Sequence, residues 1–191
     1  DAQESRGLGD VYKRQVEKRT AILDSSLELL LSEGPKGVTH RHVAAKAGVP
    51  VGSIGYYYTT REKLLATCFE HLASQQREAY ERLTGGGTDL TDPVNLAEAF
   101  VEVIACGQPQ RARVIAEAFI EGQREGGEVG AILDTVADTL RGYISTMLRK
   151  GGVENLSPDR VLQLVVGAAV TARTEHAPAM AVADLLRLAE K

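Results

Sequence analysis

The 191-residue sequence predicts an all-α protein made of two helical domains, with about nine helices in total. Apolar residues recur three and four positions apart along most of the chain, and this spacing places them on one face of a helix. No segment alternates apolar and polar residues as a half-buried strand does. A hydrophobic content of 43% with 25% charged residues is typical of a globular chain that can bury a core.

The chain begins with residues 1–15, which have no apolar periodicity and which we expect to be a disordered or non-native leader. Alternatively, Lys13 and Arg14 form a basic arm that reaches a nucleic-acid groove. A first helix is expected over about Val16 to Glu33, where leucines recur at helical spacing. Gly34 and the proline after it end this helix.

Two short helices follow, separated by a tight turn. Thr39 is suited to cap the first of them, over 40–47, because its hydroxyl accepts a hydrogen bond from an unpaired amide of the first turn. Gly48 supplies the positive φ that a sharp turn after a helix requires. Pro50 is suited to the first position of the second helix, over 51–58. A capping-box pattern, Thr59 to Glu62, then opens a longer helix.

Charge is distributed unevenly between this region and the rest of the chain. Residues 11–65 hold nine Lys and Arg against five Asp and Glu, a net charge of +4, whereas residues 66–191 hold twelve against eighteen, a net charge of −6. Two short helices joined by a glycine-containing turn in a basic segment are the arrangement that places a second helix in the major groove of DNA.

The segment "VTHRHVAAKAGVPVGSIGYYYTTREKLL", preceded by "AILDSSLELLLSEG", resembles the N-terminal domain of the TetR family of transcriptional regulators. The resemblance covers about residues 16–66. It implies a helix-turn-helix DNA-binding domain over 16–62 and a helical ligand-binding and dimerisation domain over 63–191. The matching positions are Thr39, Ala44, Ala47, Gly48, Val49, Gly52, Ser53, Tyr56, Tyr57, Tyr58, Arg61 and Glu62.

The resemblance implies contacts to DNA from both short helices. Backbone phosphates are expected at the start of the first helix and at the tyrosines, and base edges at the start of the second. Gly55 departs from the family pattern, which commonly has an aromatic residue there, and Tyr58 is expected to point inward. For the other two tyrosines, pure packing is the alternative. The expected DNA-contacting residues are Thr39, Arg41, Pro50, Val51, Gly52, Ser53, Tyr56, Tyr57 and Arg61.

The remainder of the chain is predicted to be helical, with glycine and proline between the helices. Ser157 with the proline and aspartate after it is a strong helix start. The expected helices are 61–83, 94–106, 110–121, 132–149, 158 to about 173, and 180–188.

The second domain of the family usually encloses a small, largely apolar ligand, and the resemblance implies such a chamber here. The alternative for each residue is that it only fills the core. His71 and Tyr143 are candidate polar anchors, and Glu117 or Glu121 would attract a cationic ligand. The expected chamber residues are Phe69, Leu72, Phe100, Phe119, Tyr143 and Met147.

The last two helices are apolar enough, particularly at "VLQLVVGAAV", to be difficult to bury within one subunit. The resemblance implies that they pair with their symmetry mates into a four-helix dimer interface, and an intramolecular core is the alternative. The expected interface residues are Leu162, Val166, Ala169, Val170 and Leu185.

The function expected from these features is that of a cytoplasmic homodimeric repressor, released from a palindromic operator by a small, largely apolar molecule. We expect no enzyme activity, cofactor, metal or membrane partner, since the sequence contains none of the common catalytic or phosphate-binding motifs. We also expect no disulfide, because the chain has only two cysteines, Cys68 and Cys106. Two alternatives stay open. One is a small enzyme or metal-binding protein using Cys68 and His71, and the other is an architectural DNA-binding protein without ligand control.

Overall fold

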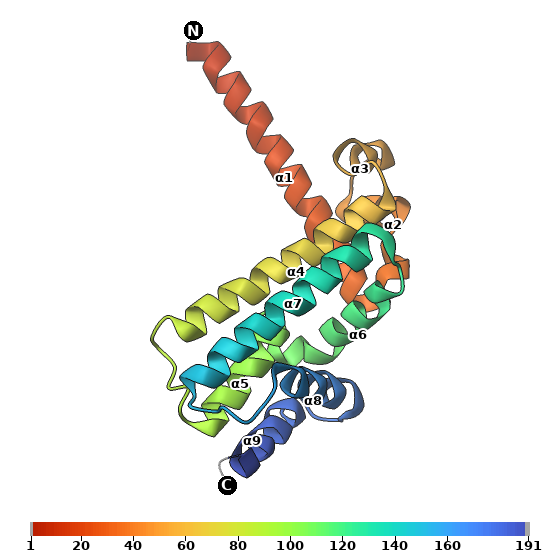
Figure 1. Cartoon of the computed structure of the whole chain (residues 1–191). Helices are drawn as coiled ribbons and strands as arrows, with labels where there is room; N and C mark the ends of the chain where they lie inside the picture. Colours follow the sequence, from red (N-terminus) through yellow and green to blue (C-terminus); the bar gives the residue numbers. More distant parts are fainter. Residues whose placement is uncertain (1, 190–191) are drawn as a thin grey trace. The chain divides into compact units, whose positions relative to one another are not determined.

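The computed structural model describes residues 2–189, and over these residues it contains nine α-helices, two short 3-10 helices and no strand (Figure 1). This confirms the predicted all-α class. No helix within the described range is both long and apolar enough to cross a membrane. The elements in order are α1 (Ala2–Glu33), η1 (Pro35–Gly37), α2 (His40–Ala47), α3 (Val51–Tyr57), α4 (Arg61–Thr84), α5 (Pro93–Ile104), η2 (Pro109–Arg111), α6 (Ala112–Gln123), α7 (Gly127–Lys150), α8 (Pro158–Thr171) and α9 (Ala177–Ala189).

The chain divides into two compact units, and the division falls inside α4. The first unit ends at Cys68 and the second begins at Phe69. The first two turns of α4 therefore belong to the same unit as α1, α2 and α3. The sequence-based boundary at residue 62 lies at the start of this helix, six residues before the division.

In the first unit, α1 and η1 pack together, α2 packs on α1, and α3 packs on α2. Its core includes one side chain from each of α1, α2, α3 and α4, and each of these side chains has an exposed fraction of 0–1%. In that order they are Ile22, Val43, Ile54 and Leu65. The first helix begins at Ala2 rather than Val16, so residues 2–15, expected to be disordered, are helical in the structure. Their assignment as a non-native leader stays a prediction.

Local signals set the two short helices. The Thr39 side chain accepts a hydrogen bond from the backbone N–H of His42, and Gly48 ends α2 in the left-handed conformation with φ 66°, so both predicted caps of α2 are confirmed. Pro50 is the N-cap of α3 rather than its first residue. The predicted capping residue Thr59 is wrong by one position, because the Thr60 hydroxyl accepts the N–H of Lys63 at 3.0 Å.

In the second unit, α5 is the most apolar of the helices whose residues form the core, and it packs against α9, α8, α7 and α6. Asp92 caps α5 and Ser157 caps α8 through their side-chain oxygens, as such residues do at helix starts. The predicted helices all occur, with shifted ends. The largest shift is in α7, which begins at Gly127 instead of Ile132.

One glycine fixes a close approach between helices in this unit. A Cβ atom at position 122 of α6 would lie 2.5 Å from Cζ of Phe69 and 2.9 Å from Cδ1 of Leu133. Both distances are below ordinary contact, so only glycine allows α6 to pack this closely on α4 and α7.

Candidate DNA-binding and ligand-binding sites

Helix α3 turns its N-terminal residues outward. Val51 is 50% exposed, and Gly52 is also exposed, with no atom within 4 Å of the position that a Cβ would take. Ser53 is half-buried, whereas Ile54 is fully buried and anchors the helix on the core of the first unit. The first turn of α3 is thus free to approach another surface closely, as a recognition helix approaches base edges.

The three tyrosines at the end of α3 differ in burial. Tyr56 is 75% exposed and packs edge to face on the half-buried Tyr57, with ring centroids 5.0 Å apart. The hydroxyl of Tyr57 donates to the backbone carbonyl of Gln15 at 3.4 Å. Tyr58 is 3% exposed, as expected for an inward residue, and burial raises its pKa although nearby Arg19 partly offsets the shift. Of these three phenols, Tyr56 and Tyr57 therefore reach the surface.

The start of α2 is a second surface suited to an anion. The first turn of α2 holds no acidic residue, and the helix N-terminus itself favours negative charge. Arg41 in this turn is exposed and makes no hydrogen bond or ion pair within the described residues. Lys46 at the other end of α2 is held by Glu28, with Nζ and Oε2 2.6 Å apart. Arg41 is thus available to a phosphate and Lys46 is occupied.

Arg61 makes hydrogen bonds within the first unit that the sequence did not indicate. Its Nε donates to the carbonyl oxygen of Val38 at 3.0 Å and its Nη2 donates to that of Pro35 at 2.6 Å. These bonds hold the η1 segment that leads into the cap of α2. The side chain is half-buried and anchors this segment in the first unit, and the phosphate contact expected at Arg61 stays a prediction.

The two histidines of α2 face different surroundings, as their spacing requires. Nδ1 of His42 lies 3.3 Å from the carbonyl oxygen of Gly37 and 3.9 Å from a carboxylate oxygen of Glu33. Nε2 of His40 is buried without a hydrogen-bond partner. At Gly55, the position that departs from the family pattern, no atom lies within 4 Å of a Cβ, so a larger side chain would fit there.

The second unit contains an apolar cavity with a volume of about 290 Å³. Five helices, α4 to α8, contribute to its wall. None of the lining residues is charged, and the only lining residues with polar side chains are three glutamines. The lining consists of Gln76, Ile104, Ile115, Ala116, Phe119, Ile120, Gln123, Leu133, Val136, Ala137, Leu140, Leu162, Gln163 and Val166.

Of the six residues expected in a ligand chamber, Phe119 lines this cavity. Tyr143 stacks on Tyr80, with ring centroids 4.1 Å apart, and lines a separate groove between α4 and α7. The other four are buried in the core with at most 1% of their surface exposed and line neither space: Phe69, Leu72, Phe100 and Met147. Packing thus uses four of the six residues that the sequence suggested for ligand contact.

The polar residues suggested for the chamber also lie elsewhere. Nε2 of His71 pairs with the side-chain amide of Gln75 at 3.1 Å. Glu117 accepts a hydrogen bond from Nε of Arg113 at 3.0 Å, and neither Glu117 nor Glu121 lines the cavity. The cavity therefore carries no carboxylate for a cationic ligand. Its buried polar group is Gln76, which the sequence reasoning missed.

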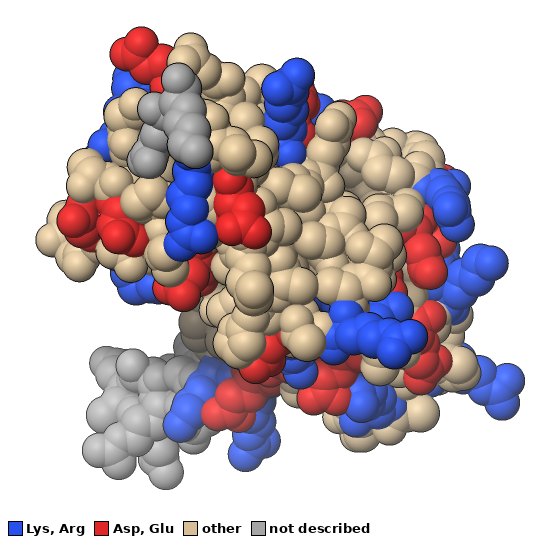
Figure 2. Space-filling view, turned by 90° about the horizontal axis from the view of Figure 1, so that it is seen from below, with Lys and Arg blue, Asp and Glu red and all other residues tan. Residues whose placement is uncertain are grey.

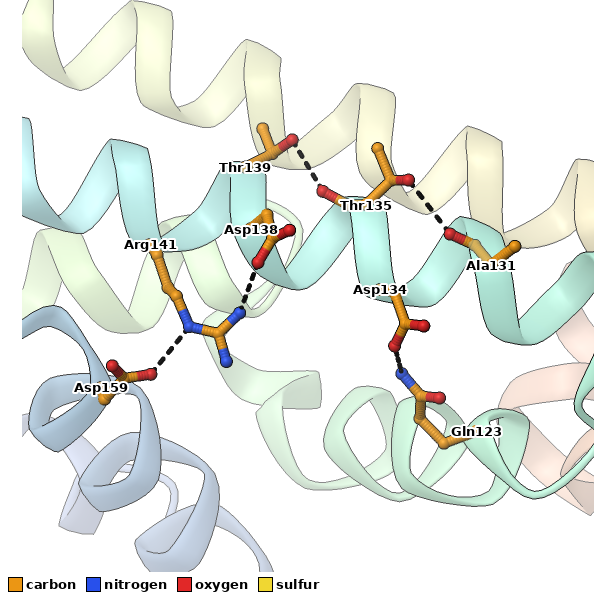
Figure 3. A network of polar contacts seen from close by, with 8 residues as sticks. All are labelled: Gln123, Ala131, Asp134, Thr135, Asp138, Thr139, Arg141 and Asp159. Atoms are coloured by element: carbon orange, nitrogen blue, oxygen red, sulfur yellow. Dashed lines mark hydrogen bonds and ion pairs between the residues drawn. The ribbon is translucent and has the colours of Figure 1, made fainter.

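Polar contacts connect three of the helices that form the cavity wall (Figure 3). Nε of Arg141 on α7 donates to Asp159 at the start of α8 at 2.7 Å, and its Nη1 donates to Asp138 at 2.8 Å. The amide of Gln123 on α6 donates to Asp134 on α7 at 3.2 Å. These contacts hold α6 and α8 against α7 on either side of the apolar space.

The residues expected at a dimer interface lie on α8 and α9 with mixed burial. Leu162, Val166 and Val170 are half-exposed and four residues apart, so they form one stripe along α8. Ala169 is 7% exposed and belongs to the core, and Leu185 on α9 is half-exposed.

Figure 2 shows one face of the molecule, on which basic and acidic side chains intermingle around uncharged surface.

The two cysteines are both buried thiols. Burial raises the pKa of Cys68 to about 12, an effect that a hydrogen bond with Ser26 partly offsets. Burial likewise raises the pKa of Cys106 to about 12, against an opposing hydrogen bond with Gln76. Both thiols keep their protons at neutral pH, whereas metal ligation and nucleophilic attack need the thiolate. Within the described part of the chain, no three His, Cys, Asp or Glu residues are grouped to hold a metal ion.

Residues 22–68 match the family described as "Bacterial regulatory proteins, tetR family". HTH-type transcriptional repressor Rv3405c of Mycobacterium tuberculosis (strain ATCC 25618 / H37Rv) is 26% identical over 126 residues, which are 63% of this chain and 59% of that protein. The match thus spans about three fifths of the length of this relative.

Solved structures extend the similarity to most of the chain. A transcriptional regulator from Rhodococcus sp. Rha1 has a TM-score of 0.68 at 16% identity and covers 88% of this chain and 94% of its own. The multidrug binding protein EbrR complexed with malachite green has a TM-score of 0.63 at 18% identity, with coverage of 90% and 96%. The sequence match over residues 22–68 and the fold similarity over about nine tenths of the chain both agree with the resemblance of this chain to the TetR family.

Proposed function

We propose that this chain is a sequence-specific repressor of the TetR family, which binds an inverted-repeat operator as a homodimer and is released by a small, largely apolar effector. The first unit carries the DNA-binding step and the second carries effector binding and dimerisation. The boundary between the units inside α4 makes this helix the covalent connection through which effector binding acts on DNA binding.

The observation that carries the DNA-binding proposal is the surface formed by α2 and α3. Val51 and Gly52 are exposed at the start of α3, while Ile54 fixes the helix beneath them. Arg41 at the N-terminus of α2 is exposed and has no hydrogen-bond or ion-pair partner among the residues that the structure describes. Base-edge contacts from the start of α3 supply specificity, and phosphate contacts from Arg41, Tyr56 and Tyr57 supply position and affinity.

The effector proposal rests on the apolar cavity of the second unit. Its volume of about 290 Å³ lies near the lower end of the range for small-molecule pockets, roughly 300–1,000 Å³. A protein of the same fold, EbrR, has been solved with malachite green and with imidazole. An effector shifts DNA affinity only if it binds the DNA-free and DNA-bound conformations with different affinities.

Dimerisation is supported by the stripe of Leu162, Val166 and Val170 on α8, which stays half-exposed in one chain. Packing this stripe against its symmetry mate would bury apolar surface in an isologous interface. A two-fold dimer presents two copies of α3, and these would read two half-sites about 34–36 Å apart, or at a multiple of that spacing.

Fluorescence anisotropy tests the proposal with labelled duplexes that tile the DNA on either side of the gene encoding this chain. We expect one duplex containing an inverted repeat to bind more tightly than the rest, with affinity that falls as salt rises. Arg41→Ala is expected to weaken binding to all duplexes, whereas Glu117→Gln, a surface change in the other unit, serves as the matched control. Equal affinity for every duplex would contradict sequence-specific regulation and favour an architectural DNA-binding protein.

A further inference from the structure

The lining of the cavity in the second unit narrows the class of effector beyond an apolar molecule. None of its lining residues is Asp, Glu, Lys, Arg or His. The charged groups beside its wall are already paired: Asp134 accepts a hydrogen bond from the lining residue Gln123 at the mouth, and Arg141 is paired with Asp138 and Asp159. A charged ligand would therefore enter without a counter-charge, and burying an unpaired charge is strongly unfavourable.

One buried amide gives the cavity a specific polar point. Gln76 is 2% exposed and lines the cavity from α4. Its Nε2 donates to the carbonyl oxygen of Ile104 at 3.2 Å, and its side chain hydrogen bonds with the thiol of Cys106. The bond to Cys106 lowers the pKa of the thiol, so the amide N–H is its donor; both N–H donors of Gln76 are then used, and its carbonyl oxygen keeps its two acceptor lone pairs. Such capacity in an apolar surrounding favours a ligand that brings a complementary neutral group.

The mouth of the cavity is solvent-exposed, whereas Gln76 is buried. Gln123 on α6 and Gln163 on α8 are the exposed glutamines that line it, and both side chains are uncharged amides. The apolar body of a ligand would lie between them and Gln76, against side chains such as Leu133 and Leu140.

We propose that the effector is an uncharged molecule, with an apolar body that fills the cavity and a neutral hydrogen-bond donor, such as an amide N–H or a hydroxyl, that pairs with the carbonyl oxygen of Gln76. The regulatory role of this ligand rests on the proposed function, whereas the preference for an uncharged ligand depends on the cavity alone.

Isothermal calorimetry on the full chain without DNA tests the preference with three compounds of one shape: 3-phenylpropanamide, 3-phenylpropanoate and 3-phenylpropylammonium. The amide is expected to bind at least about 30-fold more tightly than either ion, because the cavity offers neither ion a counter-charge. Equal affinities, tighter binding of an ion, or no binding of the amide at millimolar concentration would overturn the proposal.

Two variants assign the preference to the cavity. Gln76→Leu is expected to weaken amide binding about 3- to 10-fold, since one hydrogen bond is lost, and to leave the affinity for propylbenzene unchanged. Gln163→Glu places a carboxylate at the exposed mouth, where it does not endanger the fold. It is expected to strengthen ammonium binding about 3- to 10-fold, whereas the control Gln110→Glu, outside the cavity, leaves ammonium binding unchanged. An unchanged ammonium affinity in Gln163→Glu would overturn the assignment.

Failure of this inference and failure of the proposed function give different results. A wild-type chain that binds the ions as tightly as the amide refutes the uncharged preference, whatever its effect on DNA. A chain that binds the amide selectively but shows equal affinity for every duplex refutes sequence-specific regulation and leaves the cavity preference intact.

Discussion

Replacing Arg61 by alanine separates an anchoring role from a phosphate contact. In the structure the Arg61 guanidinium donates to the carbonyl oxygens of Val38 and Pro35, at 3.0 and 2.6 Å. Each hydrogen bond from a charged donor contributes about 1.5–3 kcal/mol when buried. The side chain is only half-buried and water replaces part of the loss, so we expect Arg61→Ala to lower the free energy of unfolding by about 1.5–3 kcal/mol.

The assay is urea unfolding followed by circular dichroism, combined with DNA binding at several salt concentrations. Arg61→Lys should recover only part of the stability, because one ammonium group cannot supply the two parallel donors of a guanidinium. Arg41→Ala is the matched control at an exposed arginine of the same unit. It is expected to leave stability within about 0.5 kcal/mol and to lower the salt slope of DNA binding by about 0.9 per protomer.

The reasoning would be refuted if Arg61→Ala left the free energy of unfolding unchanged and lowered the salt slope as Arg41→Ala is expected to do. That result would return Arg61 to the set of phosphate contacts. A loss of stability with an unchanged salt slope in the folded protein supports the anchoring role.

Four further outcomes are expected. Gly122→Ala should lower the free energy of unfolding by about 1 kcal/mol, because the overpacking against Phe69 and Leu133 exceeds the gain in helix propensity. Gly142→Ala, whose Cβ meets nothing within 4 Å, should raise it by about 0.5–1 kcal/mol, and urea unfolding measures both. Val170→Glu should yield monomers by light scattering with unchanged helix content, and a dimeric variant would exclude this stripe as the interface. Between about pH 9.0 and 12 the folded Cys68 thiol keeps its proton while the unfolded thiol loses it. The free energy of unfolding should therefore fall as pH rises through this range, and it should fall less in Cys68→Ala. Identical pH profiles for the two proteins would contradict the raised pKa.

The short helices could be predicted from the sequence because their signals are local. Thr39 and Gly48 act on the backbone within a few residues of themselves, and α2 has the predicted bounds. The start of α7 was missed because its first turn, with Gly127 and Gly130, looks like a loop by composition. Burial of Val129 in that turn, which depends on tertiary packing, accompanies the helix there.

The cavity could not be predicted in the same way, because helical spacing shows which residues face inward but not which of them meet a void. Phe100 and Met147 face inward and fill the core, while Val136 and Leu140 face inward and line the cavity. One signal for Gln76 was present, since it shares a helix face with Leu72 and Ala79, two buried apolar residues. A glutamine in such a row marks a buried polar group that needs partners.

Arg61 illustrates the limit of a motif. Its place after the tyrosines fits the family pattern, yet its partners are the carbonyl oxygens of Pro35 and Val38, more than twenty residues earlier in the chain. Sequence spacing carries no information about such a distant contact, whereas the burial of Tyr58, the residue directly after α3, agrees with the inward position that the resemblance implied.

The central claim, that α3 reads DNA sequence, is tested most directly by parallel selection of duplexes from a random pool with the wild-type chain and with Ser53→Ala. We predict that the wild-type chain enriches an inverted repeat, and that Ser53→Ala enriches a repeat altered at the same position of both half-sites, since this hydroxyl lies in the first turn of α3. Failure of the wild-type chain to enrich any sequence, or an identical repeat from both proteins and from Val51→Ala as well, would contradict the assignment of α3 as the recognition helix.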